Sequence, residues 1–370
     1  MNKTVTITVT NDLLTDGRVY KTAVFLATKG FKVKIYGRKL QKHYPNLYNN
    51  NNIKVFRYRL PFNKGKLFYI YYNILLLFVL FFSKKDILLA VDLDTILPNF
   101  IVSKLQKKKL IFDSHEYFTE LPELQNRPFT KKIWQILENF ILKKIKHCYT
   151  VSYSIAKEYE KKYKLKCEVV LNTPLKPKIE NLDSHYLINI PKNKKILIYQ
   201  GVLNVGRNID VMIEATKFLN DYILLIIGEG DLSLKLKTLA KQQNILNKKV
   251  FFLGRIPYNQ LYTITKQAYI GLSLEKPLGK NYLYALPNKL FDYIMVQVPQ
   301  IVSSLPEMSK IILKYKTGKI LNEITPQNLS TLIKNITNDE YNKMKENCYK
   351  ASQQLNWENE SKKLERFFLF

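Results

Sequence analysis

Short apolar runs alternate with helical patterns along the whole 370-residue chain, and this alternation is the feature that most limits its fold. The runs TVTITVT, KKILIYQG and YILLIIG each end at a polar residue or a glycine and lead into a helical pattern. Strands that alternate with helices indicate parallel sheets covered by helices. With 46% hydrophobic residues, the chain is long enough to bury a core in each of two α/β domains.

The charge of the chain indicates an anionic partner. Lysine and arginine number 59 against 30 acidic residues, which gives a net charge of +29. Nucleic acid, a phosphorylated substrate and a negatively charged membrane would all fit this charge. Lysine is spread over the whole length, and no helix-turn-helix, RRM, KH or zinc-finger motif is found. We therefore expect a phosphorylated substrate and peripheral contact with an anionic membrane, and no nucleic acid.

The cysteines and the start of the chain bear on the compartment. Cys148, Cys167 and Cys348 are odd in number and show no CxxC spacing. This pattern predicts a reducing compartment without a disulfide framework or a structural zinc site. The start, MNKTVTITVTNDLL, has no apolar core of signal-peptide length. We expect a cytoplasmic protein.

Residues 67–82, LFYIYYNILLLFVLFF, carry no charge and follow a basic stretch. As a helix they would reach only about 24 Å, which is short of the roughly 30 Å hydrocarbon core of a bilayer. A spanning segment is therefore not expected. A helix buried against the sheet of the first domain is the favoured interpretation, and an aromatic and basic face at the bilayer interface is the alternative. Partial burial would fit both.

Polar residues follow the predicted strands of the first half. The loop after the first strand carries Asp16, Gly17 and Arg18, and the motif FDSHEYF carries His115 and Glu116. Open parallel sheets bind ligands at this carboxyl edge, so we interpret His115 as a site residue whose neutral imidazole hydrogen-bonds a sugar hydroxyl. The loop lacks GxGxxG, which argues against a nicotinamide dinucleotide.

The sequence VDLDT places Asp92 and Asp94 in a D-x-D arrangement. In other folds such a pair holds a divalent metal. Here an apolar helical run follows Asp94, and we interpret this residue as a helix N-cap. No metal site is predicted.

The segment from Leu286 to Ser304 predicts a helix followed by a buried strand. Pro287 suits the first helical position, where its missing N–H costs nothing. The amides of Asn288 and Lys289 would then face an anion placed before the helix, and Asp292 is placed to accept from a ribose hydroxyl pair. The segment predicts a nucleotide diphosphate site, with an ordinary helix cap as the alternative.

Two more loops of the second half follow apolar strands. Gly201 and Gly206 free the backbone for close approach to a ligand, and Arg207 directly precedes a predicted helix. Arg207 would neutralise a diphosphate, or it is a surface arginine. Gly228 and Glu229 form the turn after the next strand.

Six motifs in order resemble those of bacterial GT-B glycosyltransferases of the retaining family-four type, the glycosyl transferases group 1. They are VTNDLLTDGRVYKTAVFLATKGFKV, FDSHEYF, YQGVLNVGR, LLIIGEGD, FLGRIPY and LPNKLFDYIMVQVPQIVSS. The resemblance implies two Rossmann-like α/β domains facing across a cleft. It implies an acceptor domain over 1–172, a linker over 173–194, a nucleotide-sugar domain over 195–354, and a C-terminal helix over 355–370 that crosses back.

The resemblance also implies roles for the candidate residues. The catalytic candidates are His115, Arg207 and Lys289. The donor-binding set is Gly201, Arg207, Gly228, Glu229, Glu275, Pro287, Asn288, Lys289 and Asp292, and the acceptor side is Asp16, Gly17, Arg18 and Glu116. No metal and no cofactor is implied beyond the nucleotide-sugar donor. One departure is that Tyr284 stands where the family has a glutamate, while Glu275 lies further upstream.

The sequence thus predicts a retaining glycosyltransferase. It would move a sugar from a nucleotide diphosphate to a glycan or lipid-linked acceptor, in surface polysaccharide or glycoconjugate assembly at the inner face of the cell membrane. Three alternatives stay open. They are a GT-B nucleotide-sugar epimerase using Asp113 and Glu116, a non-catalytic basic protein that binds polyanions, and a catalytically silent assembly partner.

Overall fold

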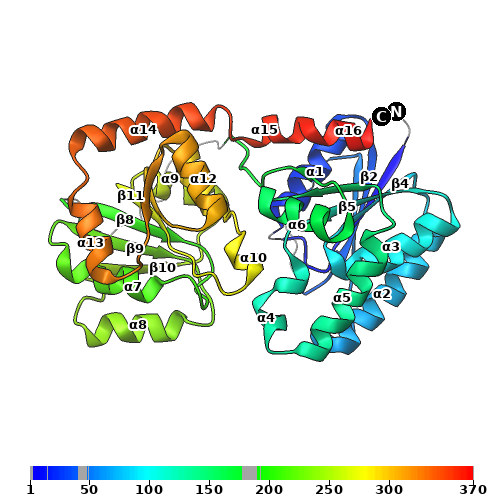
Figure 1. Ribbon diagram of the computed structural model, residues 1–370, viewed down its shortest axis with the longest axis horizontal. Helices are drawn as coiled ribbons and strands as arrows, with labels where there is room; N and C mark the ends of the chain where they lie inside the picture. Colours follow the sequence, from blue (N-terminus) through cyan, green and yellow to red (C-terminus); the bar gives the residue numbers. More distant parts are fainter. Residues whose placement is uncertain are drawn as a thin grey trace. The chain divides into compact units, whose positions relative to one another are not determined.

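The computed structural model describes residues 3–14, 16–40, 48, 50–176, 190–191 and 193–369, without the side chain of Asn259 (Figure 1). The chain divides into two compact units. The first comprises Met1–Asn172 and Glu360–Phe370, and the second comprises Thr173–Asn359. Most of the linker expected over 173–194 lies outside the described residues.

The first unit is built on a seven-stranded parallel sheet in its described residues, with the order β3-β2-β1-β4-β5-β6-β7. Its strands are β1 (Thr4–Thr8), β2 (Lys32–Arg38), β3 (Ile53–Tyr58), β4 (Ile87–Val91), β5 (Lys109–Ser114), β6 (His147–Thr150) and β7 (Glu168–Val169). The strand order reverses between β1 and β4. The loops after β1, β4 and β5 therefore meet at one carboxyl edge, where such sheets bind ligands.

Helices flank this sheet (Figure 1). They are α1 (Gly17–Thr28), α2 (Gly65–Phe82), α3 (Leu93–Leu105), α4 (Pro122–Gln125), α5 (Pro128–Leu142) and α6 (Tyr153–Tyr163). After α15 (Trp357–Glu360), the chain ends in α16 (Glu365–Phe368) on the first unit. There the ring of Phe368 meets the edge of the Phe31 ring, and the carboxylate of Glu360 accepts from the amide of Leu171 at 2.8 Å.

The second unit has a six-stranded parallel sheet in its described part, with the order β10-β9-β8-β11-β12-β13. Its strands are β8 (Lys195–Gln200), β9 (Tyr222–Ile227), β10 (Val250–Gly254), β11 (Ile270–Ser273), β12 (Gln300–Ser303) and β13 (Gly318–Leu321). Its helices are α7 (Ile209–Ala215), α8 (Ser233–Gln242), α9 (Tyr258–Thr265), α10 (Lys280–Leu283), α11 (Asn288–Met295), α12 (Pro306–Tyr315), α13 (Pro326–Lys334) and α14 (Asn338–Ser352).

Both faces of this second sheet are buried. Along β9, Leu224 and Ile226 belong to one core cluster, whereas Ile223, Leu225 and Ile227 belong to another. Successive side chains of a strand point to opposite faces, so an apolar run without alternation builds two cores at once. The order of strands reverses between β8 and β11, which places the loops after these strands at one carboxyl edge.

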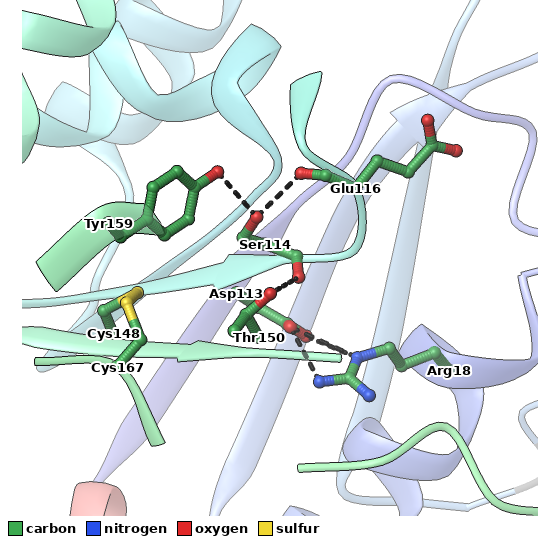
Figure 2. The surroundings of a disulfide bond; sticks show 8 residues. All are labelled: Arg18, Asp113, Ser114, Glu116, Cys148, Thr150, Tyr159 and Cys167. Atoms are coloured by element: carbon green, nitrogen blue, oxygen red, sulfur yellow. Dashed lines mark hydrogen bonds and ion pairs between the residues drawn. A yellow bond between two sulfur atoms is a disulfide. The ribbon is translucent and has the colours of Figure 1, made fainter. Parts of the chain in front are cut away.

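The expectation of no disulfide is wrong. Cys148 and Cys167 form a disulfide with their Cα atoms 4.6 Å apart (Figure 2). Cys348 is a free, buried thiol. The physical reason is strand pairing. Tyr149 of β6 is the register partner of Glu168 of β7, and each cysteine directly precedes one of these residues. The spacing of the two cysteines in the sequence does not reveal that α6 brings the chain back to β7, the strand next to β6.

The apolar segment at 67–82 lies in α2, and only one of its faces is buried. Phe68, Tyr72, Leu76 and Leu80 point into the first unit. Of the described helices, α2 is long and apolar enough to cross a membrane by length and composition, and only 22% of it is buried in the structure. The favoured interpretation of a helix buried against the sheet accounts for one face alone.

Candidate functional site

Two cations meet one buried carboxylate at the carboxyl edge of the second sheet. Glu275, just after β11, is fully buried, and its Oε1 lies 3.0 Å from Nζ of Lys289 and 3.3 Å from Nη1 of Arg207. The hydroxyl of Ser273 donates to its Oε2 at 2.9 Å. Arg207 comes from the loop after β8 and Lys289 from the first turn of α11. The structure thus brings together three predicted donor-binding residues that lie far apart in the sequence.

This cluster carries a surplus positive charge. Burial raises the pKa of Glu275, but the charges of Lys289 and Arg207 lower it more, so the net pKa lies below its ordinary value. An aromatic ring also lies against each of the two cations. Nζ of Lys289 lies 4.1 Å from the ring centroid of Tyr199, and the guanidinium of Arg207 lies 4.8 Å from that of Tyr282. One carboxylate neutralises one of the two cations, and the remaining charge is available to an anion.

The N-terminal end of α11 lies at the same edge. The helix begins at Asn288, and Pro287 is the capping residue with φ −68° and ψ 142°. The expectation that Pro287 occupies the first helical position is therefore wrong by one residue, because its ψ is extended. The first amides of a helix and its dipole favour an anion at that end. This adds to the field of the Lys289 ammonium.

Glycines connect this cluster to a neighbouring pocket. Gly201 faces Lys289, where a Cβ would make an ordinary contact of 3.4 Å with Cε of the lysine, but its φ of +139° is one that side chains rarely adopt. A Cβ on Gly228 would lie 1.9 Å from the carbonyl oxygen of Gly201, and Gly228 has a φ of +131°. Both positions therefore require glycine.

The pocket beyond Gly228 has a volume of about 420 Å³. Its lining residues are Leu203, Gly228, Glu229, Gly230, Ser233, Lys237, Phe252, Gly254 and Arg255. The sequence pointed to Gly228 and Glu229 at this place. It did not point to Lys237 and Phe252, which come from α8 and β10 and carry no local signal.

Asp292, the predicted ribose ligand, is buried and already engaged. Its exposed fraction is 6%, and its two oxygens accept from Nε2 of Gln200 at 3.0 Å and from the hydroxyl of Tyr262 at 2.9 Å. A ribose would have to share these oxygens or displace these donors. The role of Asp292 stays a prediction.

The first unit places a second ion cluster at its own carboxyl edge. Nη2 of Arg18 lies 3.0 Å from Oδ1 of Asp113, and both side chains are 2% exposed (Figure 2). Nη1 of Arg18 also donates to the carbonyl of Val170 at 2.9 Å. On the other side of the carboxylate, Nε2 of His115 lies 2.9 Å from Oδ2 of Asp113. Arg18, expected at the acceptor side, is thus the buried counterion of Asp113.

His115 is an imidazolium rather than the neutral imidazole expected. Burial lowers its pKa, but the charges of Asp113 and Asp92 raise it more, to about 9. Burial raises the pKa of Asp113, whereas Arg18 and His115 together bring it down to about 2. Asp113, two residues before His115, makes the larger contribution, and Asp92 joins it from the loop after β4, which the sequence did not reveal.

The other acceptor-side residues shape the loops of this edge. Asp16 is the N-cap of α1, and its carboxylate accepts from the amide of Val19 at 2.9 Å. Gly17 is the first residue of α1 and has open space around its Cα. The carbonyl of Glu116 accepts from the hydroxyl of Ser114, and its carboxylate points away from the Arg18–Asp113 pair (Figure 2).

The D-x-D pair does not cap a helix as expected. Helix α3 begins at Leu93, so Asp92 rather than Asp94 stands at the N-cap, with a left-handed φ of +56°. The Asp92 carboxylate instead accepts from the amides of His115 and Glu116 at 2.8 and 3.3 Å. Asp94 accepts from the hydroxyl of Thr10 at 2.7 Å. The expectation is wrong because the turn at Asp92 starts the helix two residues earlier than an N-cap at Asp94 would.

No group of three or more metal-ligating His, Cys, Asp or Glu side chains is found among the described residues.

A family model described as glycosyl transferases group 1 matches residues 184–355. The putative colanic acid biosynthesis glycosyl transferase WcaI of Escherichia coli is 29% identical over 111 residues, which cover 30% of this chain and 26% of that relative.

Solved structures are similar over nearly the full length. Sucrose-phosphate synthase from Thermosynechococcus elongatus has a TM-score of 0.81 at 15% identity, with 100% of this chain and 98% of that chain covered. The Anabaena protein HepE in complex with UDP-glucose has a TM-score of 0.74 at 10% identity, with 98% of each chain covered. At these identities the likeness concerns the fold. The predicted α/β architecture of GT-B type is confirmed.

Proposed function

We propose that this chain, in which residues 184–355 match the model of the glycosyl transferases group 1, transfers a sugar from a nucleotide diphosphate to a glycan or lipid-linked acceptor. The observation that carries the proposal is the convergence of Arg207 and Lys289 on Glu275, beside the start of α11. HepE, which shares the fold, binds UDP-glucose.

The cation cluster suits the step that such a transfer must accelerate. Cleavage of the bond between sugar and diphosphate leaves additional negative charge on the diphosphate. Arg207 and Lys289 face this charge as it forms, and interactions that strengthen in the transition state raise the rate. Glu275 acts as a positioning residue, because it fixes both cations before the donor arrives.

The pocket beside Gly228 completes the donor site in this proposal. It is joined to the cation cluster through Gly201, and its volume of about 420 Å³ falls in the range of small-molecule sites. The diphosphate lies on the cations and the nucleoside extends into the pocket. Phe252 offers an aromatic wall and Lys237 a second cation.

We assign the acceptor to the carboxyl edge of the first unit. The imidazolium of His115 has a side-chain exposure of 16% and is fixed by Asp113. It donates to a sugar hydroxyl while Asp113 keeps it protonated. We assign no covalent nucleophile and propose same-face attack assisted by the leaving group, with retention at the anomeric carbon.

The setting we propose is surface polysaccharide or glycoconjugate assembly, on the cytoplasmic side and at the inner face of the cell membrane. The name of WcaI as a colanic acid biosynthesis protein supports the pathway class. The net charge of +29 supports contact with an anionic surface.

Thermal denaturation with UDP, GDP, ADP and CMP tests the donor site. A ligand of the native state raises its melting temperature by mass action, so we expect one nucleoside diphosphate to stabilise the wild type. Arg207→Ala should lose this shift, whereas Lys314→Ala, at an exposed position of α12 in the same unit, should keep it.

Two outcomes would count against the donor site. One is the absence of a shift with every nucleotide, and the other is an equal shift in Arg207→Ala and the wild type. Product analysis with the preferred nucleotide sugar then separates transfer from epimerisation, because an epimerase changes the sugar without an acceptor.

A further inference from the structure

The outer face of α2 is an apolar stripe in contact with solvent. Its exposed members recur at helical spacing, and they are Leu67, Ile70, Tyr71, Ile74, Phe78, Phe81 and Phe82. Phe78 is 61% exposed and Phe82 is 80% exposed. An amphipathic helix of a soluble domain normally turns its polar face to water. Here the helix is apolar all round, and half of it lacks a protein partner among the described residues.

Helix α5 also turns an apolar row of side chains to solvent. Phe129, Ile133, Ile136 and Phe140 lie three or four residues apart and are all exposed, with Phe129 at 69%. The polar residue on the inner side is Glu138, which is fully buried. Its carboxylate accepts from Thr119 and Lys162 and pairs with the hydroxyl of Tyr163. The helix therefore buries its acid, together with Ile141 and Leu142 at its end, and exposes a row of four apolar side chains.

The two stripes adjoin each other. Nζ of Lys66 on α2 lies 5.1 Å from the ring centroid of Phe129 on α5, and the rings of Tyr69 and Trp134 meet edge to face at 5.2 Å. Figure 1 shows α2 and α5 next to each other at the outside of the first unit. We call the exposed residues of both helices the α2–α5 surface. An exposed apolar area of this kind marks an interaction site.

The charges around the α2–α5 surface are basic. Its margins carry Lys64, Lys66 and Lys84 near the ends of α2, and Lys132, Lys143 and Lys144 on and after α5. Helix α2 contains no acidic residue, and the acid of α5 is the buried Glu138. Nζ of Lys144 lies 3.3 Å from the ring centroid of Phe140, so charge and apolar surface are interleaved. This combination is complementary to the interface of an anionic bilayer.

Hydrogen bonds from its inner face hold α2 in the fold of the first unit. On its inner face the hydroxyl of Tyr72 donates to the carbonyl of Val9 at 2.7 Å, and Nδ2 of Asn73 donates to the carbonyl of Asp94 at 2.9 Å. The surface is thus tied to the loops that we assign to the acceptor.

We propose that the α2–α5 surface docks the first unit on the interface of an anionic phospholipid membrane. The apolar side chains enter the boundary between headgroups and acyl chains, and the surrounding lysines bind the lipid phosphates. The proposal deepens the proposed function, on which it rests for the lipid-linked acceptor. It places the acceptor edge of the first unit close to the plane in which such an acceptor lies.

Sedimentation with vesicles tests the α2–α5 surface in the full-length protein. The wild type should bind vesicles of phosphatidylglycerol and phosphatidylethanolamine, and should bind pure phosphatidylcholine weakly. The double variants Ile74→Glu/Phe78→Glu and Ile133→Glu/Ile136→Glu should each lower the partition coefficient about 10-fold or more. Leu234→Glu/Leu313→Glu is the matched control, since both leucines are exposed in the second unit.

The lysines provide a second arm. Lys132→Gln/Lys143→Gln/Lys144→Gln should weaken binding to anionic vesicles on the order of 100-fold, from roughly fivefold per basic residue near the surface. Its binding to phosphatidylcholine should not change. Equal binding of all variants and the wild type would overturn the proposal, as would a wild type that stays in the supernatant.

Light scattering and nucleotide binding separate the remaining outcomes. If the wild type is a dimer in solution and the α2 or α5 variant is a monomer, a second copy covers the surface and the proposal fails. The thermal shift with the preferred nucleoside diphosphate is measured on every variant. If the thermal shift is retained and vesicle binding is absent, the membrane proposal fails and the proposed function stands. If vesicles are bound and no thermal shift is seen, the proposed nucleotide donor is contradicted and the membrane proposal stands.

Discussion

Replacing Glu275 by glutamine removes the charge that holds the two cations of the donor site together. Glutamine has nearly the same shape, so the packing is preserved and the negative charge is lost. Arg207 and Lys289 would then face each other across a neutral amide. We expect the second unit to lose stability and, at the same time, to gain attraction for a diphosphate.

The size of the loss follows from the geometry. Oε1 of Glu275 lies 3.0 Å from Nζ of Lys289, and at an effective dielectric constant of about 20 such a contact is worth on the order of 5 kcal/mol before desolvation. Arg207 adds less, because 24% of its side chain is exposed. Breaking a buried ion pair costs about 3 to 5 kcal/mol. For a unit of this size, at about 2–4 °C per kcal/mol, the melting temperature should fall by roughly 6–20 °C.

Calorimetry with and without the preferred nucleoside diphosphate provides the assay. The diphosphate supplies the missing negative charge, so it should raise the melting temperature of Glu275→Gln more than that of the wild type. Glu307→Gln is the matched control. Glu307 is also buried in the second unit and pairs with Lys310 at 2.6 Å, but it lies in α12. That variant should lose stability without an enhanced ligand shift.

The reasoning is refuted if the nucleotide stabilises Glu275→Gln and Glu307→Gln to the same degree as the wild type. Such a result would mean that Arg207 and Lys289 do not face the diphosphate. Unchanged stability of the Glu275→Gln variant would by itself contradict the stabilisation that we assign to the ion pairs of Glu275.

Three further predictions concern single side chains. Arg207→Ala should lower the rate of transfer by about 10²-fold or more while the melting temperature changes little, because Lys289 still neutralises Glu275; a transfer assay run beside a melting curve checks both. His115 has a pKa of about 9 in the fold against an ordinary 6.5, so its stabilisation is complete below pH 6.5 and is lost as the pH rises through 9. The wild type should therefore lose up to about 3 kcal/mol more than His115→Gln between pH 6.5 and 9.5 in denaturant titrations, and parallel pH curves would contradict this. Cys148→Ser should cost about 3 kcal/mol of stability. Reductant should lower the melting temperature of the wild type to that of Cys148→Ser, and Cys348→Ser should respond to reductant as the wild type does. A wild type whose melting temperature does not change with reductant would contradict the disulfide.

The architecture was predictable from the sequence because it depends on local patterns. Apolar runs such as YILLIIG build strands that are buried on both faces, and the residues after each strand are brought to one edge by parallel pairing. Arg207 and Lys289 were predicted at a common site for this reason, and the structure places both on Glu275.

The remaining features depend on contacts between elements. The disulfide follows from the pairing of β6 with β7, and the charge of His115 follows from Asp113 together with Asp92 on the loop after β4. Glu275 lies just after β11, and α10 lies between it and α11. The pairing of the two cysteines and the approach of Asp92 to His115 leave no spacing that can be counted along the chain.

The charge balance of the two ion clusters assigns the diphosphate to the second unit. In the first unit, Arg18 and His115 both contact Asp113, whose two oxygens are engaged, and a second acid, Asp92, lies 4.0 Å from the other ring nitrogen of His115. In the second unit, two cations share one carboxylate. A diphosphate gains from the unit with the surplus cation, whereas a neutral sugar hydroxyl needs only one oriented donor such as His115. The second unit thus offers an anion site at its sheet edge, and the first unit offers a hydrogen-bond donor at its own edge.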